Sequence, residues 1–365
     1  MITLGNPCES LETVRASQPE RTSERLRHDP DRRADYPFTR LAELSADRPL
    51  RTTELLEVND HCGHATVLKE YAGLPTDYPL KVSIEGELLF GDAVSERELR
   101  CELPAILVPS GLRYPVLRER TWKALFAIGP LICYAEPALS AEQADEERRR
   151  LGRTLLAMPR NSKEPEQAER YCRHLEEVSR DFDSVRVCLS WEEVLAGRSE
   201  IYGAAGFECV TPGHPFDSSY LARLRSIIEL STVTTADRCG NQVGYCAALG
   251  KPHVLAATED TDAAARECPE FCQIERAFAV WTDELLPTQR QIVNVCWGLH
   301  EKKSPAELRL IFRIVEDMYR RRSTTLRYHE SAMEGQADIF ARLGKADLAD
   351  YLEEQIKAIR GTKPV

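Results

Sequence analysis

The feature that most constrains the fold of this chain is a repeated alternation of short apolar runs with segments of helical periodicity. The apolar runs are rich in Val, Leu, Ile and Ala, and segments rich in charged residues separate them. This alternation is typical of buried parallel strands joined by crossover helices, and it predicts an α/β fold. The predicted strands are Leu80–Ile84, Ala105–Val108, Leu155–Met158, Val185–Leu189, Phe207–Val210, Thr232–Thr235 and His253–Ala256.

The 365 residues correspond to about two domains. Residues Arg160–Glu166 break the apolar pattern before a second series of strands and helices begins. We therefore expect two Rossmann-like domains with a cleft between them, residues 36–165 and 166–300. A mobile arm is predicted for residues 1–35, which mix six Arg with seven acidic residues, and C-terminal helices for residues 301–365, which end in the amphipathic Ala346–Ile359.

Local signals place several helix starts. Ser140–Gln143 and Ser304–Glu307 both read as capping boxes, in which a hydroxyl and a side chain three residues later satisfy free amides of the first turn. Asp217 or Ser218 is predicted to cap the helix that carries Leu221 and Leu224 on one face.

Composition excludes several classes of function. The chain has 48 Lys and Arg against 59 Asp and Glu, a net charge of −11, so it lacks the cations of a generic nucleic-acid binder. Its most apolar stretch, Ala124–Ala135, is shorter than the roughly 20 residues that a membrane-spanning helix needs. The first residues show no basic segment followed by an apolar one, so a cytoplasmic location is expected.

The 12 cysteines lie mostly within apolar segments, which predicts reduced core thiols. The best candidates for a metal site, His61-Cys62-Gly63-His64 and Cys268–Cys272, do not reproduce a zinc-finger spacing. We expect no metal and no resident cofactor.

The segment Ile227–Leu255 carries the most chemical information. A predicted strand runs into a glycine-containing loop and then into a helix of small residues. Such a loop leaves backbone amides free at a helix N-terminus, where the helix dipole favours a bound phosphate. A plain turn and cap is the alternative interpretation. The candidate phosphate-binding residues are Asp237, Cys239, Gly240, Asn241, Gln242, Gly244 and Tyr245.

The run Cys239-Gly240 and Ala248-Leu249-Gly250-Lys251-Pro252 resembles the donor-side signature of GT-B glycosyltransferases and of UDP-N-acetylglucosamine 2-epimerases. Further short motifs resemble bacterial surface-polysaccharide proteins, including capsule and teichoic-acid polymerase-type transferases, and together they cover about residues 78–300. These motifs are Val82–Gly86, Pro109–Arg113, Ala127–Leu131, Leu155–Ser162 and Thr211–Asp217.

The resemblance implies a two-domain GT-B-like fold that binds a nucleotide-sugar donor and a hydroxyl acceptor. Asp237 and Tyr245 stand where retaining members have two Glu, and Glu85-Gly86 stands where polymerase-like relatives have His-Gly. Glu85 or Glu87 would then serve as general base for the acceptor hydroxyl.

Other residues complete the expected site. Arg160 and Ser162, together with the helix near Asp217, would hold the diphosphate. His214 faces the expected cleft as an acid, a base or a structural hydrogen-bonding group, and His253 is expected to be structural.

Three functions remain open on this sequence. The first is a metal-independent glycosyltransferase of surface glycan synthesis, and the second is a nucleotide-sugar epimerase or hydrolase. The third is a binding protein of the same fold in which the altered motifs record lost catalysis.

Overall fold

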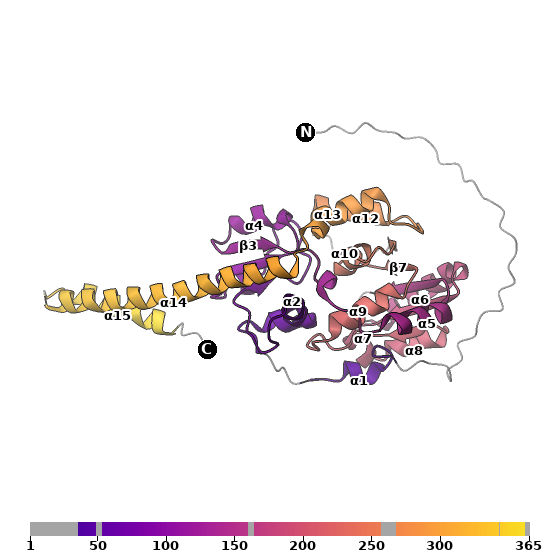
Figure 1. Ribbon diagram of the computed structural model, residues 1–365, viewed down its shortest axis with the longest axis horizontal. Coiled ribbons are helices and arrows are strands. Elements are labelled where there is room, and N and C mark those ends of the chain that lie inside the picture. Colours follow the sequence, from indigo (N-terminus) through magenta and orange to yellow (C-terminus); the bar gives the residue numbers. More distant parts are fainter. Residues whose placement is uncertain (1–35, 49–52, 160–163, 257–267, 343, 362–365) are drawn as a thin grey trace, which may run out of the picture.

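The computed structural model describes residues 36–48, 53–159, 164–256, 268–342 and 344–361 (Figure 1). Two parallel sheets organise these residues, one of three strands and one of five. The predicted α/β class is therefore confirmed. The strands are β1 (Ser83–Ile84), β2 (Ala105–Val108), β3 (Ala124–Ala127), β4 (Thr154–Met158), β5 (Ser184–Cys188), β6 (Glu208–Val210), β7 (Val233–Ala236) and β8 (His253–Leu255).

The five-stranded sheet has the order β6-β5-β4-β7-β8 and is Rossmann-like. The chain enters at β4 in the centre, adds β5 and β6 on one side, and then adds β7 and β8 on the other. The direction of strand addition therefore reverses between β4 and β7, whose register pairs Leu155 with Val233. In open α/β sheets, ligands bind beyond the carboxyl ends of the strands at such a switch point.

The three-stranded sheet has the order β1-β2-β3. Its third strand was not among the sequence predictions, because Ala124–Ala127 merges with the apolar text that follows. β1 is shorter than predicted. Asn59 occupies its free edge, where the side-chain Nδ2 donates to the Val82 carbonyl at 2.8 Å and Oδ1 accepts from the Ile84 amide at 3.0 Å.

Helices cover the sheets and connect their strands. The capping boxes at Ser140 and Ser304 are confirmed, since each hydroxyl accepts from the backbone amide three residues on and each third residue bonds back. The α-helices are α1 (Leu41–Ser45), α2 (His64–Ala72), α3 (Glu96–Arg100), α4 (Tyr114–Arg118), α5 (Ala141–Leu151), α6 (Pro165–Val178), α7 (Trp191–Leu195), α8 (Arg198–Ala204), α9 (Tyr220–Glu229), α10 (Asn241–Ala248), α12 (Pro269–Phe278), α13 (Pro287–Cys296), α14 (Pro305–Arg342) and α15 (Ala346–Gly361). The 3-10 helices are η2 (Glu57–Gly63), η3 (Gly111–Arg113), η4 (Leu131–Tyr134), η5 (Ser179–Asp181) and η6 (Leu299–Glu301).

The two sheets share one hydrophobic core. Its buried side chains include Ile84 and Leu107 of the small sheet and Leu156 of the large sheet, together with residues of α9, α10, α13 and α14. β4 precedes the predicted boundary at residues 165/166, yet it is hydrogen-bonded within the five-stranded sheet. The division of the chain into domains stays a prediction.

The C-terminal residues are helical, as expected for a C-terminal helical layer. The first turns of α14 pack on the body through Leu308, Ile311 and Phe312, but the rest of this 38-residue helix projects away from it (Figure 1). α15 packs back along α14, and Ala337 and Ile356 are buried. α14 and α15 bury apolar side chains against each other, so this helical hairpin extends from the body without packing on a sheet.

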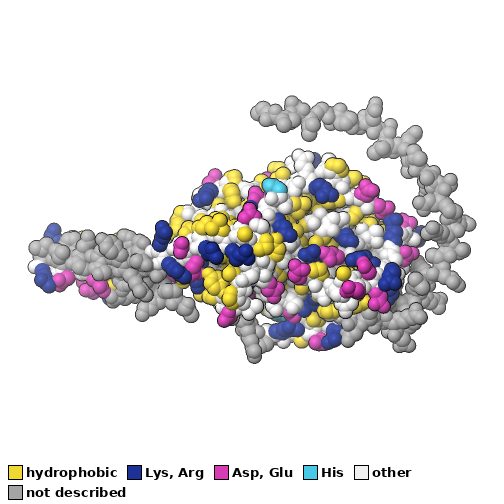
Figure 2. Space-filling view, viewed as in Figure 1, with side chains coloured by type: hydrophobic (Ala, Val, Ile, Leu, Met, Phe, Trp, Pro, Cys, Tyr) yellow, Lys and Arg dark blue, Asp and Glu magenta, His cyan; other side chains and the backbone are white. Residues whose placement is uncertain are grey.

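The surface of the body carries charges of both signs. In Figure 2, basic and acidic side chains are interspersed with apolar ones on the face that is shown. None of the described helices combines the length and apolarity needed to cross a bilayer. The predicted mobile arm, residues 1–35, lies outside the described residues.

Candidate functional site

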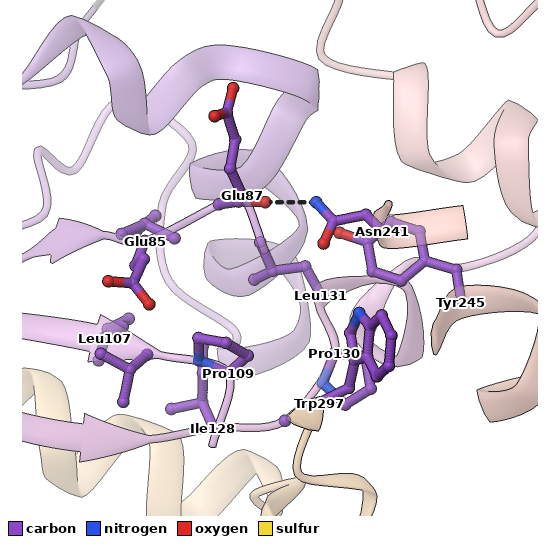
Figure 3. A pocket seen from close by; sticks show the side chains of 14 residues that line it. Glu85, Glu87, Leu107, Pro109, Ile128, Pro130, Leu131, Asn241, Tyr245 and Trp297 are labelled. Atoms are coloured by element: carbon purple, nitrogen blue, oxygen red, sulfur yellow. Dashed lines mark hydrogen bonds between the residues drawn. The ribbon is translucent and has the colours of Figure 1, made fainter. Parts of the chain in front are cut away.

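The carboxyl ends of the small sheet face the N-terminus of α10 across a narrow crevice (Figure 3). As the protein stands, the crevice leaves about 10 Å³ for the centres of water molecules, which is room for about one water. Its lining residues are Ile84, Glu85, Gly86, Glu87, Leu107, Val108, Pro109, Ile128, Gly129, Pro130, Leu131, Asn241, Tyr245 and Trp297.

The predicted sequence of strand, glycine loop and helix is confirmed in β7, the loop 237–240 and α10. Gly240, the N-cap residue, precedes the helix in an extended conformation and has no side chain with which to cap the first turn. The side chain of Asn241 instead crosses the crevice, where its Nδ2 donates to the Gly86 carbonyl at 2.7 Å (dashed line in Figure 3). The N-terminus of α10 therefore faces the small sheet with a glycine as its N-cap residue.

Gly244 and Tyr245, two of the predicted phosphate-binding residues, pack inside the protein. A Cβ atom on Gly244 would come within 2.3 Å of the Trp297 indole, so this glycine permits close packing. The role of Gly244 in phosphate binding stays a prediction. Tyr245 is buried at the back of the crevice, and this burial raises the pKa of its hydroxyl.

The remaining candidates of this loop are half-buried. Asp237 directly follows β7 at the switch point. Burial raises the pKa of Cys239 to about 12, so its thiol stays protonated at neutral pH. The Gln242 Nε2 donates to the Arg238 carbonyl at 2.5 Å and stays within its own loop.

Glu85 is a buried ion-pair partner. Its two carboxylate oxygens accept from Nε and Nη2 of Arg113 at 2.8 and 3.1 Å, and Nη2 also donates to the Ala93 carbonyl at 2.6 Å. Burial raises the pKa of Glu85, although Arg113 acts in the opposite direction. This carboxylate already has its counter-ion inside the protein.

Glu87 differs from Glu85 in its surroundings, although only one residue separates them. Its side chain is exposed, and Figure 3 shows its carboxylate directed away from that of Glu85. Glu87 also acts on the half-buried ring of His61. Burial lowers the pKa of His61, while the negative charge of Glu87 raises it and His214 adds to the lowering.

The turn that holds His61 lies between the two sheets. Cys62 adopts a left-handed conformation with φ of 53°, which is uncommon for a residue other than glycine, and its amide donates to the Pro215 carbonyl. A Cβ atom on Gly86 would meet the His64 ring at 2.3 Å, so this ring fills the space beside the glycine. Burial lowers the pKa of His64 to about 3, which keeps it neutral.

His214 is buried outside the lining of the crevice. Its Nδ1 accepts from the Phe216 amide at 3.2 Å, and its ring packs against Trp191 at a centroid distance of 4.5 Å. These contacts favour the structural alternative for His214. His253 is buried as expected, with Nδ1 2.8 Å from the Thr234 hydroxyl.

The prediction that Asp217 or Ser218 caps α9 is met only in part, because Asp217 Oδ1 accepts from the Ser219 amide at 2.9 Å in the turn just before the helix. Ser219 is the N-cap residue, and it makes no side-chain cap bond. Asp217 pairs with Arg48 and Arg223 at 2.7 and 2.9 Å. Although burial acts to raise it, the Ser219 amide and Arg223 hold the pKa of Asp217 below its ordinary value. Its charge is therefore neutralised within the protein, and Ser218 is exposed.

The crevice brings together Glu85, Glu87, Asn241 and Tyr245 from the predicted set. Arg160 and Ser162 lie outside the described residues. The sequence did not single out His61 for acid–base chemistry, because the contacts that hold it come from distant parts of the chain. Within the part of the chain that the structure describes, no three His, Cys, Asp or Glu residues gather as metal ligands would.

No family model matches this chain, and no curated protein matches it significantly. Among solved structures, it is distantly similar to the glycosylation-associated protein (Gap123) complex from Streptococcus agalactiae, with 9% sequence identity and a TM-score of 0.29. The match covers 60% of this chain and 44% of that one, so it spans less than half of the matched chain.

Proposed function

We propose that this chain binds a nucleotide-activated sugar in the crevice and transfers the sugar to a hydroxyl acceptor, as a GT-B-like glycosyltransferase would. The five-stranded sheet would hold the donor, and the small sheet would present the acceptor. The observation that carries the proposal is the N-terminus of α10, which begins at an N-cap glycine and faces the crevice.

The topology of the large sheet supports this placement of the donor. The loop before α10 follows β7, which neighbours β4 at the switch point of the sheet. Arg160 and Ser162, which lie outside the described residues, stay sequence predictions for the diphosphate. Backbone amides at a helix N-terminus stabilise a bound diphosphate. The same amides would stabilise the negative charge that develops on the diphosphate when it leaves the sugar. Asp237, Cys239, Gly240 and Gln242 would contribute through this loop.

For the proton transfer we propose Glu87 together with His61, in preference to Glu85. A general base has to reach the acceptor hydroxyl, and Glu87 is exposed beside the crevice, whereas Arg113 already binds both oxygens of Glu85. The lowered pKa of His61 leaves its imidazole neutral near pH 7, the form that accepts a proton.

A thermal-shift series with UDP, GDP and CMP tests the donor site. A nucleotide at about 100 times its dissociation constant should add about 2.7 kcal/mol to the free energy of unfolding. Asn241→Asp should abolish the shift, because a carboxylate at the first turn of α10 repels a diphosphate and removes the donor to Gly86.

Gln291→Glu is the matched control, since it adds the same charge on an exposed position of α13. It should keep the full nucleotide shift. If none of the three nucleotides changes the melting temperature, or if Asn241→Asp responds as the unsubstituted chain does, the donor site is not at α10.

A binding protein without transferase activity is the second candidate. One observation favours it: the Glu85–Arg113 pair, which occupies the carboxylate that stands where polymerase-like relatives have His-Gly. Release of nucleoside diphosphate from a sugar donor separates the two functions. A transferase loses this turnover in Glu87→Gln and in His61→Gln, whereas a binding protein shows no turnover and keeps the nucleotide shift.

A further inference from the structure

A lysine amine and a cysteine thiol meet on the small sheet, away from the crevice. The amine of Lys123, at the start of β3, donates to the Glu98 and Cys101 carbonyls at 2.6 and 2.5 Å. It also lies 3.1 Å from the Cys101 sulfur. Lys123 is 3% exposed, and its amine satisfies carbonyls at the C-terminal end of α3.

The thiol is open to small oxidants while the amine is held in place. Cys101 is half-buried, and its Sγ also donates to the Glu98 carbonyl at 3.2 Å. Three contacts hold the amine, so the nitrogen stays beside the sulfur without any movement of the backbone. The 3.1 Å separation is a few tenths of an ångström longer than the span of a nitrogen–oxygen–sulfur link.

We propose that Cys101 and Lys123 form a covalent nitrogen–oxygen–sulfur bridge when the protein meets dioxygen. The thiol loses its S–H bond and the neutral amine loses one N–H bond. One oxygen atom of O2 forms new bonds to nitrogen and to sulfur. The other oxygen leaves as water with the two hydrogens. Nitrogen and sulfur each give up two electrons, and dioxygen accepts four. An ammonium would first release a proton to solvent.

The bridge joins the end of α3 to the start of β3. α3 carries Glu98, whose pKa is raised mainly by burial and further by the charge of Glu85, which pairs with Arg113. The modification would therefore clamp the supports of the small sheet on the side that carries Glu85. Because thiol-derived links of this oxidation level are reversible, a reductant such as dithiothreitol should restore both side chains.

Peptide mapping of the full chain tests the bridge. The protein is held in buffer with heavy-oxygen-labelled dioxygen, with an anaerobic sample beside it, and is digested without reductant. We expect the Cys101 and Lys123 peptides as one species that is heavier than their sum by one labelled oxygen and lighter by two hydrogens. Dithiothreitol should separate them.

Two variants and an internal control give the result its meaning. Cys101→Ser keeps an acceptor for the amine, Lys123→Arg keeps the charge, and neither should give the linked species. Cys268, a half-buried thiol 2.8 Å from Glu270 Oε2, has a carboxylate beside it and should stay unlinked. Recovery of Cys101 as a free thiol, a sulfinic acid or a disulfide after this treatment overturns the proposal. A direct nitrogen–sulfur link without oxygen also overturns it.

Discussion

The two sheets present very different edges to the same crevice. At the small sheet, the protein's own side chains fill the carboxyl ends of the strands: Arg113 binds Glu85, and the His64 ring packs against Gly86. At the large sheet, α10 follows an N-cap glycine that has no side chain, and Asn241 supplies a hydrogen bond to the opposite edge.

The two edges therefore differ in what they can bind. We call the small-sheet edge with the Glu85–Arg113 pair the wall, and the large-sheet edge with the first turn of α10 the cradle. Both edges consist of strand ends that lead into loops, but of the two described sheets only the large one has a topological switch point beside a helix that starts at an N-cap glycine. Buried charge is already paired at the wall, so new charge there has no partner. Backbone amides at the cradle still have the capacity to bind an anion.

The largest expected effect comes from Glu85→Gln. The substitution leaves the Arg113 charge buried without a counter-ion, so the free energy of unfolding should fall by about 3 kcal/mol. Glu87→Gln, on an exposed side chain of the same edge, should change it by less than about 0.5 kcal/mol. Urea unfolding of both variants measures the contrast. Equal effects would mean that Glu85 is not part of the wall.

Gly244→Ala tests whether the glycine of α10 serves packing. The new methyl group would collide with the Trp297 ring, so we expect a loss of about 1–3 kcal/mol in the free energy of unfolding. Gly203→Ala is the control, because this glycine lies in α8 with nothing within 4 Å of the added atom. The control should be neutral or stabilise the helix by about 0.5–1 kcal/mol. If Gly244→Ala leaves the free energy of unfolding unchanged, close packing against Trp297 is not the reason for this glycine, and a role in phosphate binding becomes the better interpretation.

Local patterns in the sequence located most elements of the fold. The first and last residues of β2 were predicted correctly, because Ala105–Val108 is a short apolar run bounded by polar residues and prolines. β3 was missed, since its four residues continue into the apolar text that follows. The capping box at Ser140 was readable because both partners lie within three residues.

The site was less predictable, because its defining contacts are long-range. Glu85 and Arg113 are 28 residues apart, and Asn241 bonds to a carbonyl 155 residues earlier. No local pattern reports such pairs. The loop before α10 was recognisable from its glycines, whereas the packing of Gly244 depends on Trp297, which follows 53 residues later in the sequence. His61 was missed as an acid–base candidate for the same reason.

The smallest predicted effect concerns Glu98, which lies behind the wall in α3. Burial is the main cause that raises the pKa of this carboxyl to about 8, and Glu85 adds to it. A carboxyl whose pKa is higher in the folded state favours folding fully below its unfolded pKa of 4.5. That contribution is lost as the pH rises through about 8. Glu98→Gln cannot ionise, so it should escape this loss.

Unfolding free energies of the wild type and Glu98→Gln, measured from about pH 5 to about pH 9, give the test. The variant should gain about 1–2 kcal/mol relative to the wild type toward the alkaline end, because only the wild type has to bury a carboxylate or fold it protonated. Burial lowers the pKa of His64 and His253 to about 3, which weakens both proteins alike in acid, so the difference between them isolates Glu98. A free-energy difference between the two proteins that stays constant across this range would mean that the Glu98 carboxyl is solvated, and that α3 does not bury it behind the small sheet.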